Sequence, residues 1–255
     1  MSVHVERTSS TAKITIDTPP ANALSHALIQ RIGEVHQELL EDESVKVIIL
    51  TGSGRFFAAG ADITEFTEVK HGSEFSNLAR DGQRVFRQLE TSVKPVIAVM
   101  HGAALGGGLE LAMACHLRIA AEGTKLGLPE LNLGLIPGFA GTQRLPKLVG
   151  RAKALELMLT ASPIDAREAA ACGLVNSVVP EEDLMQAAET LAAKMAEKSS
   201  GTIQAVMELT LQAEWETIDR GQEREAVRFG DVFDHPDAKE GIQAFLDKRK
   251  PAFKE

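Results

Sequence analysis

Apolar and polar positions follow two different periods in the first half of the chain. Residues 3–6 and 12–17 alternate with period two on either side of Thr8-Ser9-Ser10, which predicts a β-hairpin. Residues 24–40 place their apolar side chains on one stripe of a helix, and a second long helix is predicted over 73–92. Three near-continuous apolar runs predict buried strands: 45–51, 94–100 and 116–121. Strands that alternate with helices in this way predict an α/β fold.

After residue 145 the pattern predicts helices alone, and the longest of them is interrupted near residues 219–221. The expected ranges are 151–160, 165–172, 181–197, 202–233 and a last helix after Pro236. Several of these helices have apolar faces with no further partner in the chain, which predicts contacts between subunits. We therefore predict an α/β core over residues 1–195 and a C-terminal helical oligomerisation region over 196–255.

Two glutamates stand in otherwise apolar surroundings. Glu110 follows three glycines and opens an apolar helix predicted over 109–115, and Glu130 follows Leu128-Pro129. Each could simply be a helix-start or loop residue bonded to nearby backbone. Alternatively, two buried carboxylates facing one cleft could divide general-acid and general-base work, because burial and mutual repulsion let one of them keep its proton.

The glycines at 106–108 connect the apolar strand at 94–100 with this helix. The first amides of a helix lack internal partners and carry the positive end of its dipole. The order of residues does not match a dinucleotide loop, because Ala104 stands at the second glycine position, and no phosphate-loop Gly-Lys-Ser/Thr is present. The loop is better interpreted as a set of backbone donors to an oxygen that becomes negatively charged, an oxyanion hole.

A second source of such donors follows the strand at 45–51. Small residues from Ala58 to Ala61 leave the backbone uncovered, and Asp62 is placed to cap a short helix. On this segment alone, a strand, a loop and a capped helix without any site is an equally good interpretation.

Several motifs together resemble the crotonase (enoyl-CoA hydratase/isomerase) superfamily. They are 20–25 (PANALS), 57–63 (FAAGADI), 104–112 (ALGGGLELA), 126–130 (LGLPE), 134–138 (GLIPG), 141–145 (GTQRL) and 235–245 (HPDAKEGIQAF). They occur in register over essentially the whole chain. The resemblance implies repeated β-β-α units wound into a spiral, followed by a C-terminal helical region, and a homotrimer or a dimer of trimers.

The resemblance also implies roles for individual residues. The amides of Ala61 and Gly107 would form the oxyanion hole for the thioester carbonyl of an acyl-CoA. Glu110 would be the general base on water and Glu130 the acid that protonates the α-carbon, which together indicate a 2-enoyl-CoA hydratase of the β-oxidation type. Coenzyme A would arrive as the substrate thioester, with no separate cofactor and no metal. Further substrate contacts are expected at Ala23, Ala59, Asp62, Ile63, Gly106, Gly108, Pro129 and Gly138.

Some positions depart from the family pattern. Phe139-Ala140 stands where Ala-Gly is usual, Thr64 where relatives often have Lys, and Ala103 where an aromatic is frequent. These positions concern substrate range more than reaction type. Phe139 either narrows the acyl tunnel or only packs.

Composition narrows the function classes further. The chain has 255 residues, 44% of them apolar and 25% charged, and a formal net charge of −9, which disfavours nucleic acid as a principal partner. We expect no signal segment, no membrane span and two reduced cysteines, and hence a cytoplasmic location. Two alternatives to a hydratase remain: another crotonase-fold reaction, such as isomerisation or methylglutaconyl-CoA-type hydration, and a non-catalytic RNA-binding relative.

Overall fold

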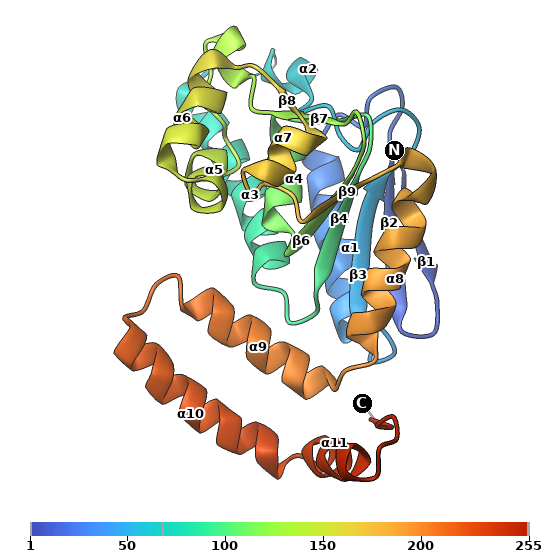
Figure 1. The fold of residues 1–255 in the computed structure, drawn as a ribbon. Helices are drawn as coiled ribbons and strands as arrows, with labels where there is room; N and C mark the ends of the chain where they lie inside the picture. Colours follow the sequence, from blue (N-terminus) through green and yellow to red (C-terminus); the bar gives the residue numbers. More distant parts are fainter. Residues whose placement is uncertain (1, 68, 254–255) are drawn as a thin grey trace.

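A six-stranded sheet lies at the centre of the computed structural model, which describes residues 2–67 and 69–253. Its strands are β1 (Ser2–Arg7), β2 (Thr11–Asp17), β3 (Val47–Gly52), β4 (Val96–Met100), β6 (Leu117–Ala121) and β9 (Ser177–Val179). They are arranged in the order β1-β2-β3-β4-β6-β9 (Figure 1). The predicted hairpin is confirmed, since β1 and β2 pair antiparallel with Val5 opposite Ile14. The other neighbouring pairs are parallel.

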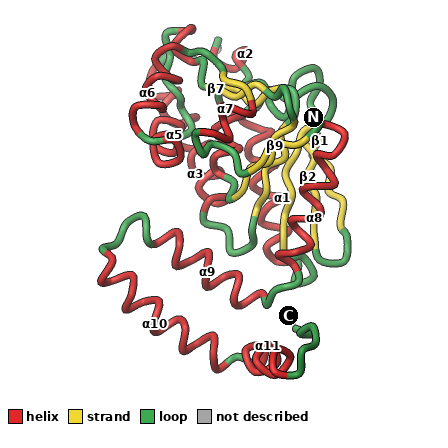
Figure 2. Tube along the Cα trace, viewed as in Figure 1, coloured by secondary structure: helices red, strands yellow, loops and turns green. Residues whose placement is uncertain are grey.

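Both faces of this sheet are buried. Ile48 and Leu50 of β3 pack into the larger core, whereas Val47 and Ile49 on the opposite face pack into a smaller one. Among the helices that contribute to the larger core are α1 (His26–Glu41), α3 (Gly72–Glu90) and α4 (Gly107–Ala114). On the other face lies α8 (Leu184–Ala196) (Figures 1 and 2). This two-sided burial accounts for the continuous apolar runs of the parallel strands.

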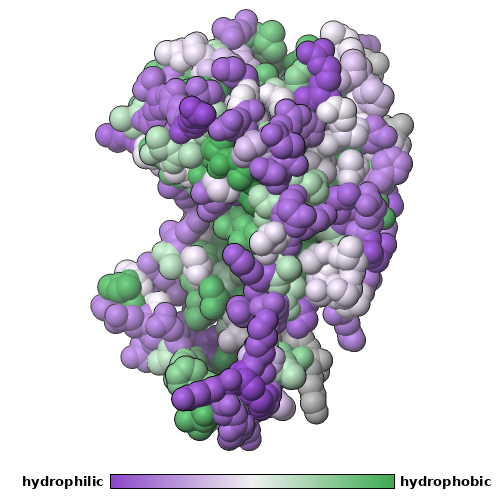
Figure 3. Space-filling model, turned by 45° about the vertical axis from the view of Figure 1, so that its right-hand side comes forward, coloured by the Kyte–Doolittle hydropathy of each residue, from purple (hydrophilic) through white to green (hydrophobic). Residues whose placement is uncertain are grey.

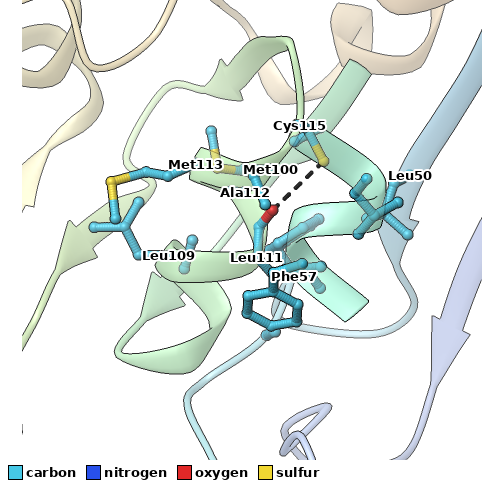
Figure 4. Packing of buried hydrophobic residues seen from close by; sticks show 14 of the residues in the cluster. Leu50, Phe57, Met100, Leu109, Leu111, Ala112, Met113 and Cys115 are labelled. Atoms are coloured by element: carbon cyan, nitrogen blue, oxygen red, sulfur yellow. Dashed lines mark hydrogen bonds between the residues drawn. The ribbon is translucent and has the colours of Figure 1, made fainter. Parts of the chain in front are cut away.

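Helix α4 is buried along its whole length. Leu109, Leu111, Ala112 and Met113 from α4 gather with side chains of neighbouring strands and loops, and Cys115 lies just past the helix end (Figure 4). A helix that is apolar on all sides is expected to be enclosed by the core. The packing therefore fixes the position of the one charged residue of α4, Glu110.

A small second sheet holds the loop that precedes α4. It consists of β5 (Ala103–Leu105), β7 (Lys125–Gly127) and β8 (Ile164–Asp165), in the order β5-β7-β8. Leu105 lies opposite Gly127 in the parallel register, and the Gly106 amide donates to the Gly127 carbonyl at 2.9 Å. The turn into α4 is thus anchored to β7 by the pairing of β5 and by the Gly106 amide.

The prediction that only helices follow residue 145 is wrong. Strands β8 and β9 also occur there, and β9 pairs with β6 at the edge of the large sheet. Strands of two or three residues are too short to show a period in the sequence. Besides α8, the α-helices in this part are α5 (Gly141–Val149), α6 (Arg151–Thr160), α7 (Ala166–Ala171), α9 (Ser200–Gln212), α10 (Ile218–Asp234) and α11 (Pro236–Leu246).

The predicted helix over 202–233 is interrupted, but not at 219–221. Helix α9 ends at Gln212 and α10 begins at Ile218, so Gly221 lies inside a helix, where its amide donates to the Thr217 carbonyl at 3.0 Å. A single glycine within a helix is tolerated at modest cost and is therefore a weak breaker. In Figure 1 the helices α9 to α11 form an arm below the α/β body. The predicted division at residue 195 stays a prediction.

In the described part of the chain, no helix combines enough length with enough apolar character to span a bilayer.

One buried histidine stands out in the larger core. The His36 side chain on α1 is fully buried, and neither ring nitrogen has a hydrogen-bond partner among the described residues. Burial, with added repulsion from His116 and Lys94, lowers the pKa of His36 to about 4. The Lys94 side chain lies nearby and donates from Nζ to the carbonyls of Leu39 and Asp42, and burial lowers the pKa of Lys94. His36 is therefore buried as the neutral imidazole.

This burial predicts acid sensitivity. Because the folded pKa of about 4 lies below the ordinary value of 6.5, the unfolded chain binds the proton more readily, and stability is lost as pH falls from 6.5 toward 4. The contribution of His36 is at most about 3 kcal/mol. Compared with the wild type, His36→Phe should lose less unfolding free energy between pH 7 and pH 5 in urea titrations. The exposed control His71→Phe should follow the wild type; an equally acid-sensitive His36→Phe would contradict this account.

Candidate active site

A cavity of about 210 Å³ opens where the glycine loop, the Ala58–Ala61 segment and the loop before α5 meet. Apolar side chains, glycine backbone and two carboxylates form its wall. The lining residues are Ala59, Gly60, Ala61, Ile63, Phe66, Phe75, Leu78, Ala79, Gly106, Gly107, Glu110, Pro129, Glu130, Leu133, Leu135, Ile136, Gly138 and Phe139. Pockets of this character, apolar with a few convergent polar groups, are typical of small-molecule sites.

Tertiary hydrogen bonds position the segment that carries Ala61. Buried Asn22 donates through its side-chain amide to the carbonyls of Ser53 and Phe56, at 2.9 and 2.8 Å, and so holds the preceding loop. Ala58 then pairs with the glycine-loop strand, because its amide donates to the Ala103 carbonyl at 3.2 Å and its carbonyl accepts from Leu105 at 3.1 Å. This pairing places the two predicted donor segments side by side.

Neither the Ala61 amide nor the Gly107 amide donates to an acceptor among residues 2–67 and 69–253. The residues on either side of Ala61 bond to Leu24: the Gly60 carbonyl accepts from its amide, and the Asp62 amide donates to its carbonyl. No acceptor for the Ala61 amide itself occurs among the described residues. Gly107 is the first residue of α4, so its amide has no intrahelical partner. A Cβ atom built on Gly107 would lie 3.5 Å from the Ala61 nitrogen. Two unpaired donors therefore meet at one point of the cavity wall.

Gly106 and Gly108 have separate reasons to be glycine. Gly106 has a φ of 50°, and a Cβ there would also come within 2.9 Å of the Glu130 carboxylate. A Cβ on Gly108 would overlap the Ala58 carbonyl. Gly107 alone of the three leaves a backbone donor facing the cavity, which agrees with its predicted role.

The Glu110 carboxylate is almost completely buried, with the residue 1% exposed. Its Oε1 accepts from the amides of Phe139 and Gly141, at 2.8 and 2.7 Å. Burial raises the pKa of Glu110 to about 7; the Gly141 amide opposes this rise, and the nearby Glu130 adds to it. Around neutral pH this carboxyl can therefore both take up and release a proton.

Glu130 opens a short 3₁₀ turn over Glu130–Leu133, across the cavity from Glu110. Its Oε2 is buried without a hydrogen-bond partner among the described residues, and burial raises its pKa. An orphaned carboxylate oxygen favours the protonated form, since no donor stabilises the charge. The two predicted carboxylates thus share one cavity in different surroundings.

The loop that supports Glu110 is itself held by α3. Arg144 donates from Nη1 to the Phe139 carbonyl at 2.8 Å and forms a two-point ion pair with Glu90 of α3, at 3.0 and 3.1 Å. Gln83 of α3 donates to the Gly138 carbonyl at 2.8 Å. These bonds orient the peptide between Gly138 and Phe139, whose amide faces Glu110.

Most predicted substrate contacts lie in the cavity wall. Ala59, Ile63, Gly106, Pro129 and Gly138 line it together with the four principal residues. By contrast, Ala23, Asp62 and Gly108 do not line it, and their role as substrate contacts stays a prediction. Asp62 does cap α2 (Ile63–Phe66) as expected, accepting from the Thr64 amide at 3.0 Å.

Sequence reasoning missed three parts of the site. These are the two amides that hold Glu110, the Arg144–Glu90 pair, and the aromatic wall made by Phe66 and Phe75. Only the wall had a signal in the sequence. Phe75, Leu78 and Ala79 are apolar residues that precede the core-facing positions of α3 at helical spacing. Among the described residues, no cluster of three or more His, Cys, Asp or Glu side chains is placed to hold a metal ion.

Comparisons with known proteins agree with this geometry. Residues 6–255 match the family model described as "Enoyl-CoA hydratase/isomerase". A protein of Bacillus subtilis named "Probable enoyl-CoA hydratase" is 53% identical over 95% of both chains. The "Crotonyl-CoA hydratase" of Syntrophomonas wolfei is 42% identical over 98% of this chain and 96% of its own. The crystal structure of an enoyl-CoA hydratase from Bacillus anthracis superposes with a TM-score of 0.95 at 36% identity, covering 100% of this chain and 99% of that one.

Proposed function

Because the chain belongs to the enoyl-CoA hydratase/isomerase family, we propose that it adds water across the 2,3 double bond of a 2-enoyl-CoA to give a 3-hydroxyacyl-CoA. The observation that carries this proposal is the meeting of two unpaired backbone amides, the buried Glu110 carboxylate and the half-buried Glu130 carboxylate in one cavity. Relatives named crotonyl-CoA hydratase and short-chain-enoyl-CoA hydratase support it, at 42% and 40% identity.

The two amides supply the electrophilic half of the reaction. Addition at C3 moves negative charge onto the thioester oxygen, which accepts hydrogen bonds from Ala61 and Gly107. Both donors are fixed by backbone pairing and helix packing, so they need no reorganisation as the charge develops. Loss of one such donor costs about 3 kcal/mol of transition-state stabilisation.

The carboxylates divide the proton transfers. Two close carboxyls repel each other when both are ionised, so around neutral pH they tend to share one proton. The two amides on Glu110 favour its ionised form, whereas Glu130 has a bare oxygen and favours the proton. Glu110 therefore takes a proton from the attacking water, Glu130 gives one to C2, and exchange with solvent restores both.

No cofactor is proposed besides the coenzyme A of the substrate, because hydration neither oxidises nor reduces the acyl chain.

We propose a short acyl chain as the preferred substrate. A cavity of about 210 Å³ is smaller than the roughly 300–1,000 Å³ typical of small-molecule pockets. The name of the Syntrophomonas wolfei relative points the same way.

We further propose a trimer or a dimer of trimers in the cytoplasm. The helical arm exposes apolar side chains in numbers unusual for a free surface, with Phe229 of α10 74% exposed. They are Val206, Trp215, Ile218, Val227, Phe229, Phe233, Ile242, Phe245 and Leu246. Apolar surface also lines the hollow between the body and the arm (Figure 3). The two cysteines, Cys115 and Cys172, are unpaired, as is usual in a reducing compartment.

The activity is tested with crotonyl-CoA, by the loss of ultraviolet absorbance of the conjugated thioester and identification of 3-hydroxybutyryl-CoA. Glu130→Gln should lower kcat by about 10²–10⁴-fold while acyl-CoA affinity changes little, because general acid–base catalysis contributes in that range. Near-normal turnover in Glu130→Gln would exclude its role as the acid.

Glu110→Gln should suppress hydration far more than any isomerase activity.

The pH profile tests Glu110 as the base. Since its pKa is about 7 and the ionised form is active, kcat/KM for crotonyl-CoA should fall toward tenfold per pH unit below that value. The residual activity of Glu110→Gln should lack this acid limb. A wild-type rate that stayed constant from pH 7 to pH 5.5, with the protein still folded, would contradict the assignment.

Light scattering tests the assembly. The wild type should have the mass of three or six chains, and Phe229→Lys together with Phe233→Lys should reduce it, because charge would replace apolar contact area. A monomeric wild type at micromolar concentration would refute the proposed assembly without bearing on the chemistry.

A further inference from the structure

The Phe139 side chain lies in the cavity wall and has no role in the proposed reaction, which involves only the backbone of this residue. Its ring lies between α3 and the start of α4. A Cβ built on Gly107 would be 3.2 Å from two atoms of the ring, next to the donors proposed for the thioester oxygen. The ring edge therefore lies close to where the first carbons of an acyl chain would pass.

The ring fits a notch on α3. Phe86 meets it edge to face, with ring centroids 5.3 Å apart and an interplanar angle of 62°. Gly82, one turn earlier, leaves the space that the rest of the ring fills, because a Cβ at Gly82 would overlap two ring atoms. No space for an acyl chain remains between the ring and α3 at this point.

The backbone of Phe139 is held on both sides. Its amide donates to Glu110, its carbonyl accepts from Arg144, and the Gly138 carbonyl of the preceding peptide accepts from Gln83. A ring on a backbone anchored in this way cannot retreat without disturbing the support of Glu110. The ring is therefore a rigid part of the wall.

We propose that Phe139 determines the size of acyl group that this protein accepts, closing the cavity between Gly82 of α3 and the start of α4 and confining it to short, unbranched 2-enoyl thioesters. The proposal rests on the hydratase function proposed above. Other parts of the wall are formed by Ile63, Phe66 and Phe75 from α2 and the first turn of α3, and by exposed Leu133 and Ile136.

The test is the ratio of kcat/KM for 2-octenoyl-CoA to that for crotonyl-CoA. Each methylene accommodated in an apolar pocket changes such ratios about tenfold or more. Phe139→Ala should therefore raise the ratio at least about tenfold over the wild type. Phe139→Leu is a milder variant that should raise it less and guards against misfolding of the alanine variant, which thermal melting would reveal.

Gly82→Ala provides a test of opposite sign. The new methyl group should push the ring into the cavity and lower kcat/KM for octenoyl-CoA more than for crotonyl-CoA. Adding Phe139→Ala removes the overlap, so the double variant should recover a ratio above the wild-type value, a non-additivity that indicates direct contact.

Phe75→Ala is the matched control, since it removes the same kind of side chain from a different part of the cavity wall. The proposal is overturned if Phe139→Ala changes the ratio no more than Phe75→Ala does, or if the Gly82 effect persists unchanged in the double variant. A wild type that hydrates neither substrate would instead refute the proposed function, so the two failures are distinguishable.

Discussion

The burial of one carboxylate, that of Glu110, governs the arrangement of this site. A charged group in an apolar interior needs hydrogen-bond donors or must keep its proton. The chain supplies two backbone amides, one from the loop before α5 and one from the first residue of α5, and this requires that segment to approach the buried helix α4 closely. Gly141 permits that approach, because a Cβ there would come within 2.9 Å of the Glu110 carboxylate. The fold of residues 138–141 is thus a consequence of what Glu110 requires.

In the proposed reaction, backbone geometry, more than side-chain identity, provides the electrophilic groups. The Ala61 amide is left unpaired because its two neighbours make the bridge to Leu24, and the Gly107 amide is left unpaired because a helix begins there. Neither donor depends on a rotamer. Such donors do not move as charge develops, which is what preorganised electrostatic stabilisation requires.

Much of this arrangement was predictable from residue order. The glycine loop at a helix start, the cap at Asp62 and the apolar setting of both glutamates are local signals, and the structure places both glutamates in one cavity. The amides of Phe139 and Gly141 were not predictable, because every residue but proline has an amide and only tertiary contact selects two of them. Strands β8 and β9 were missed for a related reason: their pairing partners, more than their own two or three residues, define them.

The Arg144–Glu90 ion pair joins two parts of the site that otherwise have separate tasks. Glu90 belongs to α3, whose earlier turns form the acyl wall and the notch for Phe139, while Arg144 holds the loop that supports Glu110. A shift of α3 that made room for a larger acyl group would pull on the same loop and alter the proton affinity of Glu110. In the proposed reaction, the range of acyl groups and the base strength of Glu110 are therefore linked through the structure. A sequence change that admitted larger acyl groups by moving α3 would also shift the pH optimum.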